Sequence, residues 1–238
     1  VEILSGLSGF LYGANRVGGE VNYVTKRPTA TPLSNVTVGD YGGANGYVHG
    51  DFGGPLGHGD FGYRTNFVVQ GGDTAIDHSG LHRYLASIAL DWHAADNLLF
   101  QIYGAHYDAE QDGIEPTWLL GTAKAYPSAP DAEKLWSQPW SRERVVTDKA
   151  IVNGTWNIND ALTFRSAFRY AQYVDRLAAI SNQIQSNGTY VQSFQARAPR
   201  TLQNFGGYDF LDATFNTGFI AHKVTMGVYG DQYIFNQH

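Results

Sequence analysis

The sequence predicts an all-β fold: an antiparallel transmembrane β-barrel, of which the chain holds about nine strands. Three observations predict it. Several segments alternate apolar and polar residues with a period of two over eight or more positions. Short and long connections alternate along the chain, and aromatic residues gather near the ends of the expected strands. No segment has the hydrophobic pattern of a helix of three turns.

Composition excludes several classes of protein. The chain has 238 residues, of which 16% are charged and 14% aromatic, with no Cys and a net charge of −6. The low charged fraction is untypical of a disordered chain. The absence of Cys excludes a disulfide framework and a thiolate metal site, and the acidic balance disfavours nucleic acid as a partner. No apolar run reaches about 18 residues, a length that the strands of a membrane barrel do not need.

The first 28 residues differ from the rest. Residues 1–4 and 20–25 are strand-like, and between them lies a run of small residues in which glycines predict tight turns. The chain begins at Val1 and shows no signal peptide, so we expect it to be an internal fragment of a longer protein. We expect two parts, residues 1–28 and 29–238.

The clearest expected strands have one apolar face and one mixed face. In residues 84–92, the even positions from Tyr84 to Trp92 are apolar, and the odd positions include Ser87 and Asp91. A cation at the bilayer midplane costs a barrel about 2–4 kcal/mol, and the apolar faces of these strands carry no charge. We expect the mixed face to line a wet or plug-filled lumen, where its cations pair with carboxylates of the plug or of the lumen. The clear strands are residues 61–70, 84–92, 150–158, 162–170 and 223–228, and the cations are Arg64, Arg165 and Arg169.

The connections predict which ends of the strands lie together. Short turns are expected near residues 57–60, 95–97, 159–160 and Gly218, and long loops at 74–81, 110–144 and 177–202. An antiparallel meander places all short turns at one rim and all long loops at the other, as in outer-membrane barrels.

Aromatic residues are expected to form a girdle at each membrane interface. A soluble β-sandwich, which buries its apolar face in its own core, is the alternative fold. It explains neither the girdles nor the alternation of short and long connections. The residues near the short turns are Phe61, Tyr63, Trp92, Phe100, Trp156, Phe164 and Phe215, and those near the long loops are Tyr84, Tyr103, Tyr107, Tyr170, Tyr173 and Tyr233.

The opening segment resembles a known family. Residues 1–4 (VEIL), 8–13 (SGFLYG) and 18–28 (GGEVNYVTKRP) are similar to the end of the plug domain in TonB-dependent ferric-siderophore receptors of the ferrichrome type. Leu7 and Val17 stand where the family usually has Pro. The resemblance implies that residues 1–28 are the C-terminal end of a plug and residues 29–238 the N-terminal part of a barrel that has 22 strands in the family.

The resemblance also implies a function. The protein would be a receptor and active transporter of the bacterial outer membrane that imports a ferric siderophore. TonB, with ExbB and ExbD, would supply the energy through an N-terminal region that this fragment lacks. Outer-membrane lipid and lipopolysaccharide would be further partners. The resemblance implies neither an enzyme nor a cofactor, because the iron is held within the siderophore.

Five aromatic residues are candidates for ligand contact: Trp118, Tyr103, Tyr107, Tyr170 and Tyr173. In ferrichrome-type receptors the corresponding loop opens with an aromatic residue and a Trp-Leu-Pro-like segment that contact the ligand. Residues 118–120 (WLL) are similar to that segment, although Pro116 stands where the family has the aromatic residue. The four tyrosines lead toward long loops, and a position in the interfacial girdle is the alternative role for each.

Other functions stay open at this stage. A TonB-dependent receptor could carry cobalamin, haem or an oligosaccharide, although the loops lack the paired His expected for haem. An outer-membrane enzyme would need a Ser/His or Asp/His constellation at the rim, which the sequence does not show. A soluble β-sandwich binding module is opposed by the plug-like first 28 residues.

Overall fold

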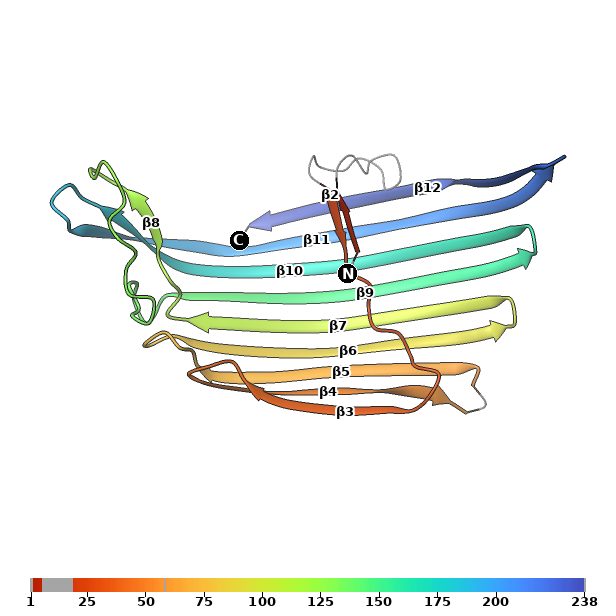
Figure 1. The fold of residues 1–238 in the computed structure, drawn as a ribbon, viewed down its shortest axis with the longest axis horizontal. Helices are drawn as coiled ribbons and strands as arrows, with labels where there is room; N and C mark the ends of the chain where they lie inside the picture. The colour runs from red at the N-terminus through yellow and green to blue at the C-terminus, as the bar shows by residue number, and fades with distance from the viewer. Residues whose placement is uncertain (1, 6–18, 58, 238) are drawn as a thin grey trace.

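The computed structural model describes residues 2–5, 19–57 and 59–237 as two antiparallel sheets (Figure 1). The smaller sheet pairs β1 (Glu2–Ser5) with β2 (Gly19–Asn22). The larger sheet has ten strands, nine of which follow one another in the order β12-β11-β10-β9-β7-β6-β5-β4-β3. The all-β prediction and the expected number of strands are confirmed. Residues 6–18, which carry much of the glycine-rich run and the SGFLYG motif, lie outside the described residues.

The nine strands form a meander in which every neighbouring pair is antiparallel. Over the described ranges, no helix has the length and apolar character to cross a membrane. The strands are β3 (Leu33–Asp40), β4 (Ala44–Leu56), β5 (Phe61–Asp73), β6 (Gly80–Ala95), β7 (Leu98–Asp112), β9 (Arg142–Asn159), β10 (Leu162–Ile184), β11 (Tyr190–Thr217) and β12 (Ile220–Gln237).

The register gives the sheet two chemically different faces. Trp92 lies beside Phe61 and Phe100 across the neighbouring strands, and its ring centroid is 5.7 Å from each of theirs. Asp91 points to the opposite side, where it lies beside Gln101. We call the side of Trp92 the outward face and the side of Asp91 the lumen face.

The outward face is apolar and exposed. Among the described residues only three hydrophobic side chains are buried, namely Ala89, Ile180 and Ile184, while outward residues such as Trp92 and Phe168 are 44% and 54% exposed. A β-sandwich would bury such a face in its own core. The sandwich alternative is therefore wrong, and the outward face has the composition of a surface covered by lipid.

The expected girdles are confirmed at one rim and mostly wrong at the other. All seven aromatic residues expected near the short turns point outward. At the other rim, only Tyr84 and Tyr170 do so. The other four lie on the lumen face, because closeness to a strand end does not fix the side of a residue, whereas its odd or even position does. These four are Tyr103, Tyr107, Tyr173 and Tyr233.

The connections define a turn rim and a loop rim, at the right and left of Figure 1. The turn rim carries the expected short connections, at 57–60, 96–97, 160–161 and 218–219. At the loop rim, strict alternation fails because 41–43 is also a short turn.

The long loop expected at 177–202 is wrong. β10 continues to Ile184 and β11 starts at Tyr190, so the connection spans only 185–189. Beyond the lipid both faces of a strand meet water or protein, and apolar alternation no longer marks the strand. The expected loop at 110–144 also contains a short strand, β8 (Thr117–Leu120), which pairs in parallel with residues 181–184 of β10.

One carboxylate lies within the apolar part of the outward face. Asp209 of β11 is exposed there, with Ser166 and Val228 as its cross-strand neighbours. Leu211 and Phe205 point outward on either side of it along the strand. A charge in lipid is unfavourable, so Asp209 reduces the stability of the sheet in a membrane.

Replacing Asp209 with Leu should therefore stabilise the full-length barrel in liposomes by about 1–3 kcal/mol, because it removes an ionisable group from lipid. Urea titration of the folded barrel measures the difference. Asp212 is the matched control, since it lies three residues away on the lumen face and binds Arg165. Asp212→Leu should lower stability, and a loss of stability in both variants would contradict the outward position of Asp209.

Candidate ligand-binding site

Ion pairs between strands cover the part of the lumen face nearer the turn rim. Two of the pairs join an Arg of one strand to an Asp of the next, and Arg169 of β10 reaches over Gly206 of β11 to Asp231 of β12. The expected pairing of the lumen cations is thus satisfied by carboxylates of the sheet itself. The pairs and their shortest N–O distances are Arg64–Asp51 (2.8 Å), Arg165–Asp212 (2.6 Å) and Arg169–Asp231 (2.5 Å).

A row of mainly apolar residues crosses the lumen face closer to the loop rim. Tyr107 and Tyr173 belong to this row and lie on either side of Thr147. The row provides three aromatic rings and two leucine side chains on one surface, which suits a ligand with apolar and aromatic parts. In strand order its members are Leu85, Tyr107, Thr147, Tyr173, Leu202 and Phe235.

Tyr103 also lies on the lumen face, nearer the turn rim. Its cross-strand neighbours are Ala89 of β6 and Ile151 of β9. The structure thus brings three of the five candidate residues, Tyr103, Tyr107 and Tyr173, to the same side of the sheet.

Tyr170 lies on the other side. Its ring packs against outward-facing Phe205 at a centroid distance of 5.0 Å. Its hydroxyl donates to Gln172 Oε1 at 3.1 Å and accepts from Gln203 Nε2 at 3.3 Å. An aromatic ring next to lipid with a hydrogen-bonded hydroxyl is typical of the interfacial girdle, the alternative role for this residue.

Trp118 lies in β8, not in an irregular loop, and forms part of an aromatic cluster. Its ring centroid is 5.9 Å from that of Trp136 and 5.5 Å from that of Tyr190. The backbone carbonyl of Trp136 accepts hydrogen bonds from the side-chain amides of Asn182 and Gln192, both at 2.9 Å. These contacts hold the 121–141 segment against the extended parts of β10 and β11.

The lumen face also carries a charged cluster beyond Tyr173. Asp175 is 1% exposed and accepts hydrogen bonds from Arg197 Nη1 at 2.9 Å and from Arg200 Nε at 2.7 Å. A register shift between residues 175 and 177 lets both arginines reach the same carboxylate. The cluster fastens β10 to β11 where the two strands leave the membrane region.

Sequence reasoning missed this cluster. Asp175 follows Tyr173 by two positions, so period-two alternation places both on one face. The expected loop at 177–202 concealed the pairing, because it assigned both arginines to a connection instead of a strand.

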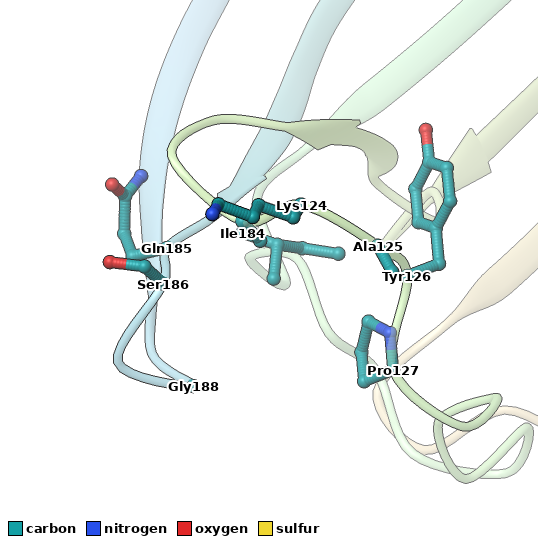
Figure 2. Close-up of a pocket in the computed structure, with 9 residues that line it drawn as sticks. Lys124, Ala125, Tyr126, Pro127, Ile184, Gln185, Ser186 and Gly188 are labelled. Atoms are coloured by element: carbon teal, nitrogen blue, oxygen red, sulfur yellow. The ribbon is translucent and has the colours of Figure 1, made fainter.

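The tip of the β10–β11 extension holds an open pocket of about 490 Å³. Residues 123–127, which follow β8, form one side, and the other side is formed by Ile184, Gln185, Ser186 and Gly188. Figure 2 shows Lys124 and Tyr126 on the first side. None of the five candidate residues lines this pocket.

Comparison with curated proteins gives two relatives. The ferrichrome receptor FcuA of Yersinia enterocolitica is 24% identical over 234 residues, which are 95% of this chain and 30% of that protein. The ferrichrome outer membrane transporter/phage receptor of Escherichia coli (strain K12) is 24% identical over 252 residues, covering 95% of this chain and 33% of that protein. The chain thus spans about a third of the length of these relatives. No family model matches the chain.

Solved structures share the fold. BauA, the ferric preacinetobactin receptor from Acinetobacter baumannii, superposes on 98% of this chain with a TM-score of 0.89 and 23% identity, and the match covers 36% of BauA. FpvA of P. aeruginosa with a bound pyoverdine gives a TM-score of 0.87 at 17% identity, with coverage of 98% of this chain and 32% of FpvA. The ferric-catecholate import receptor Fiu from E. coli K12 gives 0.83 at 18% identity, covering 96% and 35%.

These comparisons confirm two expectations and agree with a third. The fold is that of the corresponding third of the receptor barrels. The resemblance to ferric-siderophore receptors is borne out by the names of the relatives, which describe receptors and transporters. The name of the Escherichia coli relative places that protein in the outer membrane, which agrees with the location expected for this chain.

The Asp175 cluster generates a prediction. In Asp175→Asn, Arg197 and Arg200 lose their shared counter-charge, and the β10–β11 extension should open more often. We expect amide hydrogen exchange in residues 190–200 of the full-length protein to rise about tenfold. Asp209→Asn, on the outward face, is the control and should leave that exchange unchanged. Equal exchange in Asp175→Asn and the unmodified protein would show that the cluster does not hold the extension.

Proposed function

We propose that the chain is part of an outer-membrane receptor that imports a ferric siderophore. One observation carries the proposal: a sheet with a lipid-type outward face and a hydrogen-bonded, ion-paired lumen face aligns over 95% of its sequence with ferrichrome receptors. In this proposal residues 1–28 are the end of the plug that fills the lumen, and residues 29–238 are the first part of the barrel.

The proposed ligand contacts are Tyr103, Tyr107 and Tyr173. The chelator already surrounds the iron, so the receptor needs to supply surfaces and hydrogen bonds, not metal ligands. Tyrosine offers both, through a flat ring and a hydroxyl. Trp118 enters the proposal indirectly, because its cluster positions the segment at the loop rim. Tyr170 is left out, since its ring faces away from the lumen.

The other proposed partners follow from this location. TonB, with ExbB and ExbD, would supply energy by acting on the plug. Outer-membrane lipid would cover the apolar part of the outward face, and lipopolysaccharide would surround the strands nearer the loop rim.

Uptake by cells tests the function. Deletion of the gene should abolish import of one radioiron-labelled siderophore from a panel of hydroxamates, catecholates and pyoverdines, and import should also require TonB. The expected result is loss of import of one siderophore, with import of the others unaffected. Unchanged import of the whole panel, together with loss of cobalamin, haem or oligosaccharide uptake, would overturn the proposed cargo.

The lumen tyrosines give a second test. Tyr107→Ala and Tyr173→Ala should each raise the dissociation constant for the imported siderophore about tenfold, as loss of an aromatic contact does. Tyr84→Ala and Tyr170→Ala are matched controls from the outward face and should change it less than about twofold. Binding to whole cells at low temperature separates affinity from transport. An equal loss of affinity in the outward variants would contradict the proposed contact of Tyr107 and Tyr173 with the ligand.

A further inference from the structure

The segment that follows β2 crosses the lumen face before the meander begins. It passes in front of β9, β7, β6 and β5 to reach the start of β3 at the opposite edge (Figure 1). Its consecutive residues Lys26 and Arg27 both carry positive charge, and both bind carboxylates of the sheet.

Lys26 joins an ion pair that is already complete without it. Its ammonium donates to Asp51 Oδ2 at 2.7 Å and to Asn66 Oδ1 at 3.1 Å. Asp51 is also held in a bidentate contact by Arg64, with both distances at 2.8 Å. The Asp51 side chain is only 7% exposed, whereas that of Lys26 is 51% exposed, so the carboxylate is shielded from water and the lysine stem is not. Lys26 is thereby fixed to β4 and β5 together.

Arg27 makes the matching contacts to the next two strands. Its guanidinium pairs with Asp91 and donates to the carbonyl oxygen of Leu90 at 3.0 Å and to that of Ile102 at 3.5 Å. Its own carbonyl accepts a hydrogen bond from Arg64 Nη1 at 3.2 Å. Two adjacent residues thus bind four strands, β4 to β7.

Pro28 packs directly on the sheet. A Cβ added to Gly62 would lie 2.7 Å from Pro28 Cβ, so the close approach depends on the absence of a side chain at Gly62. Gly62 is the register partner of Asp91, which places the apolar contact beside the second ion pair.

We propose that residues 26–28 are a fixed anchor that stays bound to the barrel while the chain before them is displaced during transport. The inference rests on the proposed function. A pull applied upstream reaches Val24 and Thr25 before the anchor, and to go further it would have to break the contacts of Lys26 and Arg27 together. Asp51 would keep Arg64. Asp91, which is only 14% exposed, would lose its pairing with Arg27, and removing one partner from such a pair is strongly unfavourable because the other charge stays behind without compensation. The anchor therefore sets the boundary between the part that moves and the part that does not.

A disulfide tests this directly. In Pro28→Cys with Gly62→Cys the two Cβ atoms would start 2.7 Å apart, which is shorter than the 3.5–4.5 Å of a disulfide, so residue 28 must move back by about 1 Å for the bond to form; the chain has no Cys of its own. The double variant is made in the full-length receptor. We expect the oxidised form to import its siderophore within about twofold of the reduced form. Import that falls at least tenfold on oxidation and returns with reductant would overturn the anchor.

Labelling gives a second measurement that needs no cross-link. The single variant Pro28→Cys is exposed to a maleimide in energised cells with and without siderophore, and denatured receptor defines complete labelling. Equal labelling in both conditions is expected, and a several-fold increase during import would overturn the anchor. Failure of the unmodified receptor to import any siderophore would count instead against the proposed function.

Discussion

The structure depends on one constraint, the pairing of every strand with its neighbours. In hydrocarbon, a peptide group without a partner costs several kcal/mol, so a chain that crosses lipid as strands must pair along its whole length. The meander meets this demand with long, nearly unbroken registers, such as the one that joins residues 162–175 of β10 to residues 200–213 of β11. Because pairing fixes which residues lie side by side, it also determines whether each side chain lies on the outward face or on the lumen face.

The part of the fold in contact with lipid could be predicted from sequence, and the part beyond it could not. Outward residues such as Trp92 and Phe168 are apolar, as a face in contact with lipid requires, and the resulting alternation of apolar and polar residues with a period of two is visible in the sequence. In residues 177–200 the strands leave lipid, and residues such as Ser181 and Ser193 pair without any apolar pattern. Three of the five candidate site residues reach the lumen face. Their side of the sheet follows from their odd or even position along the strand, which closeness to a strand end does not reveal.

Charge on the lumen face is mostly internal to the protein. Arg64, Arg165 and Arg169 each bind a carboxylate of another strand of the sheet, so they contribute to its cohesion. Lys26 and Arg27 also bind carboxylates of the sheet, and these ion pairs connect the opening segment to the barrel strands. A surface whose cations are already neutralised offers little general attraction to anions, and recognition of a ligand then falls to shape and to aromatic contact.

β10 has 23 residues, whereas about 9–11 residues suffice to cross a bilayer as a tilted strand. The remaining residues of β10, together with β8 and the beginning of β11, form an extension beyond the part of the sheet that is long enough to cross the membrane. The connection at 185–189 closes the far end of this extension. Because Asp175 binds Arg197 and Arg200 at the base of this extension, the sequence of the connection at 185–189 can vary without loosening the pairing of β10 and β11 below it.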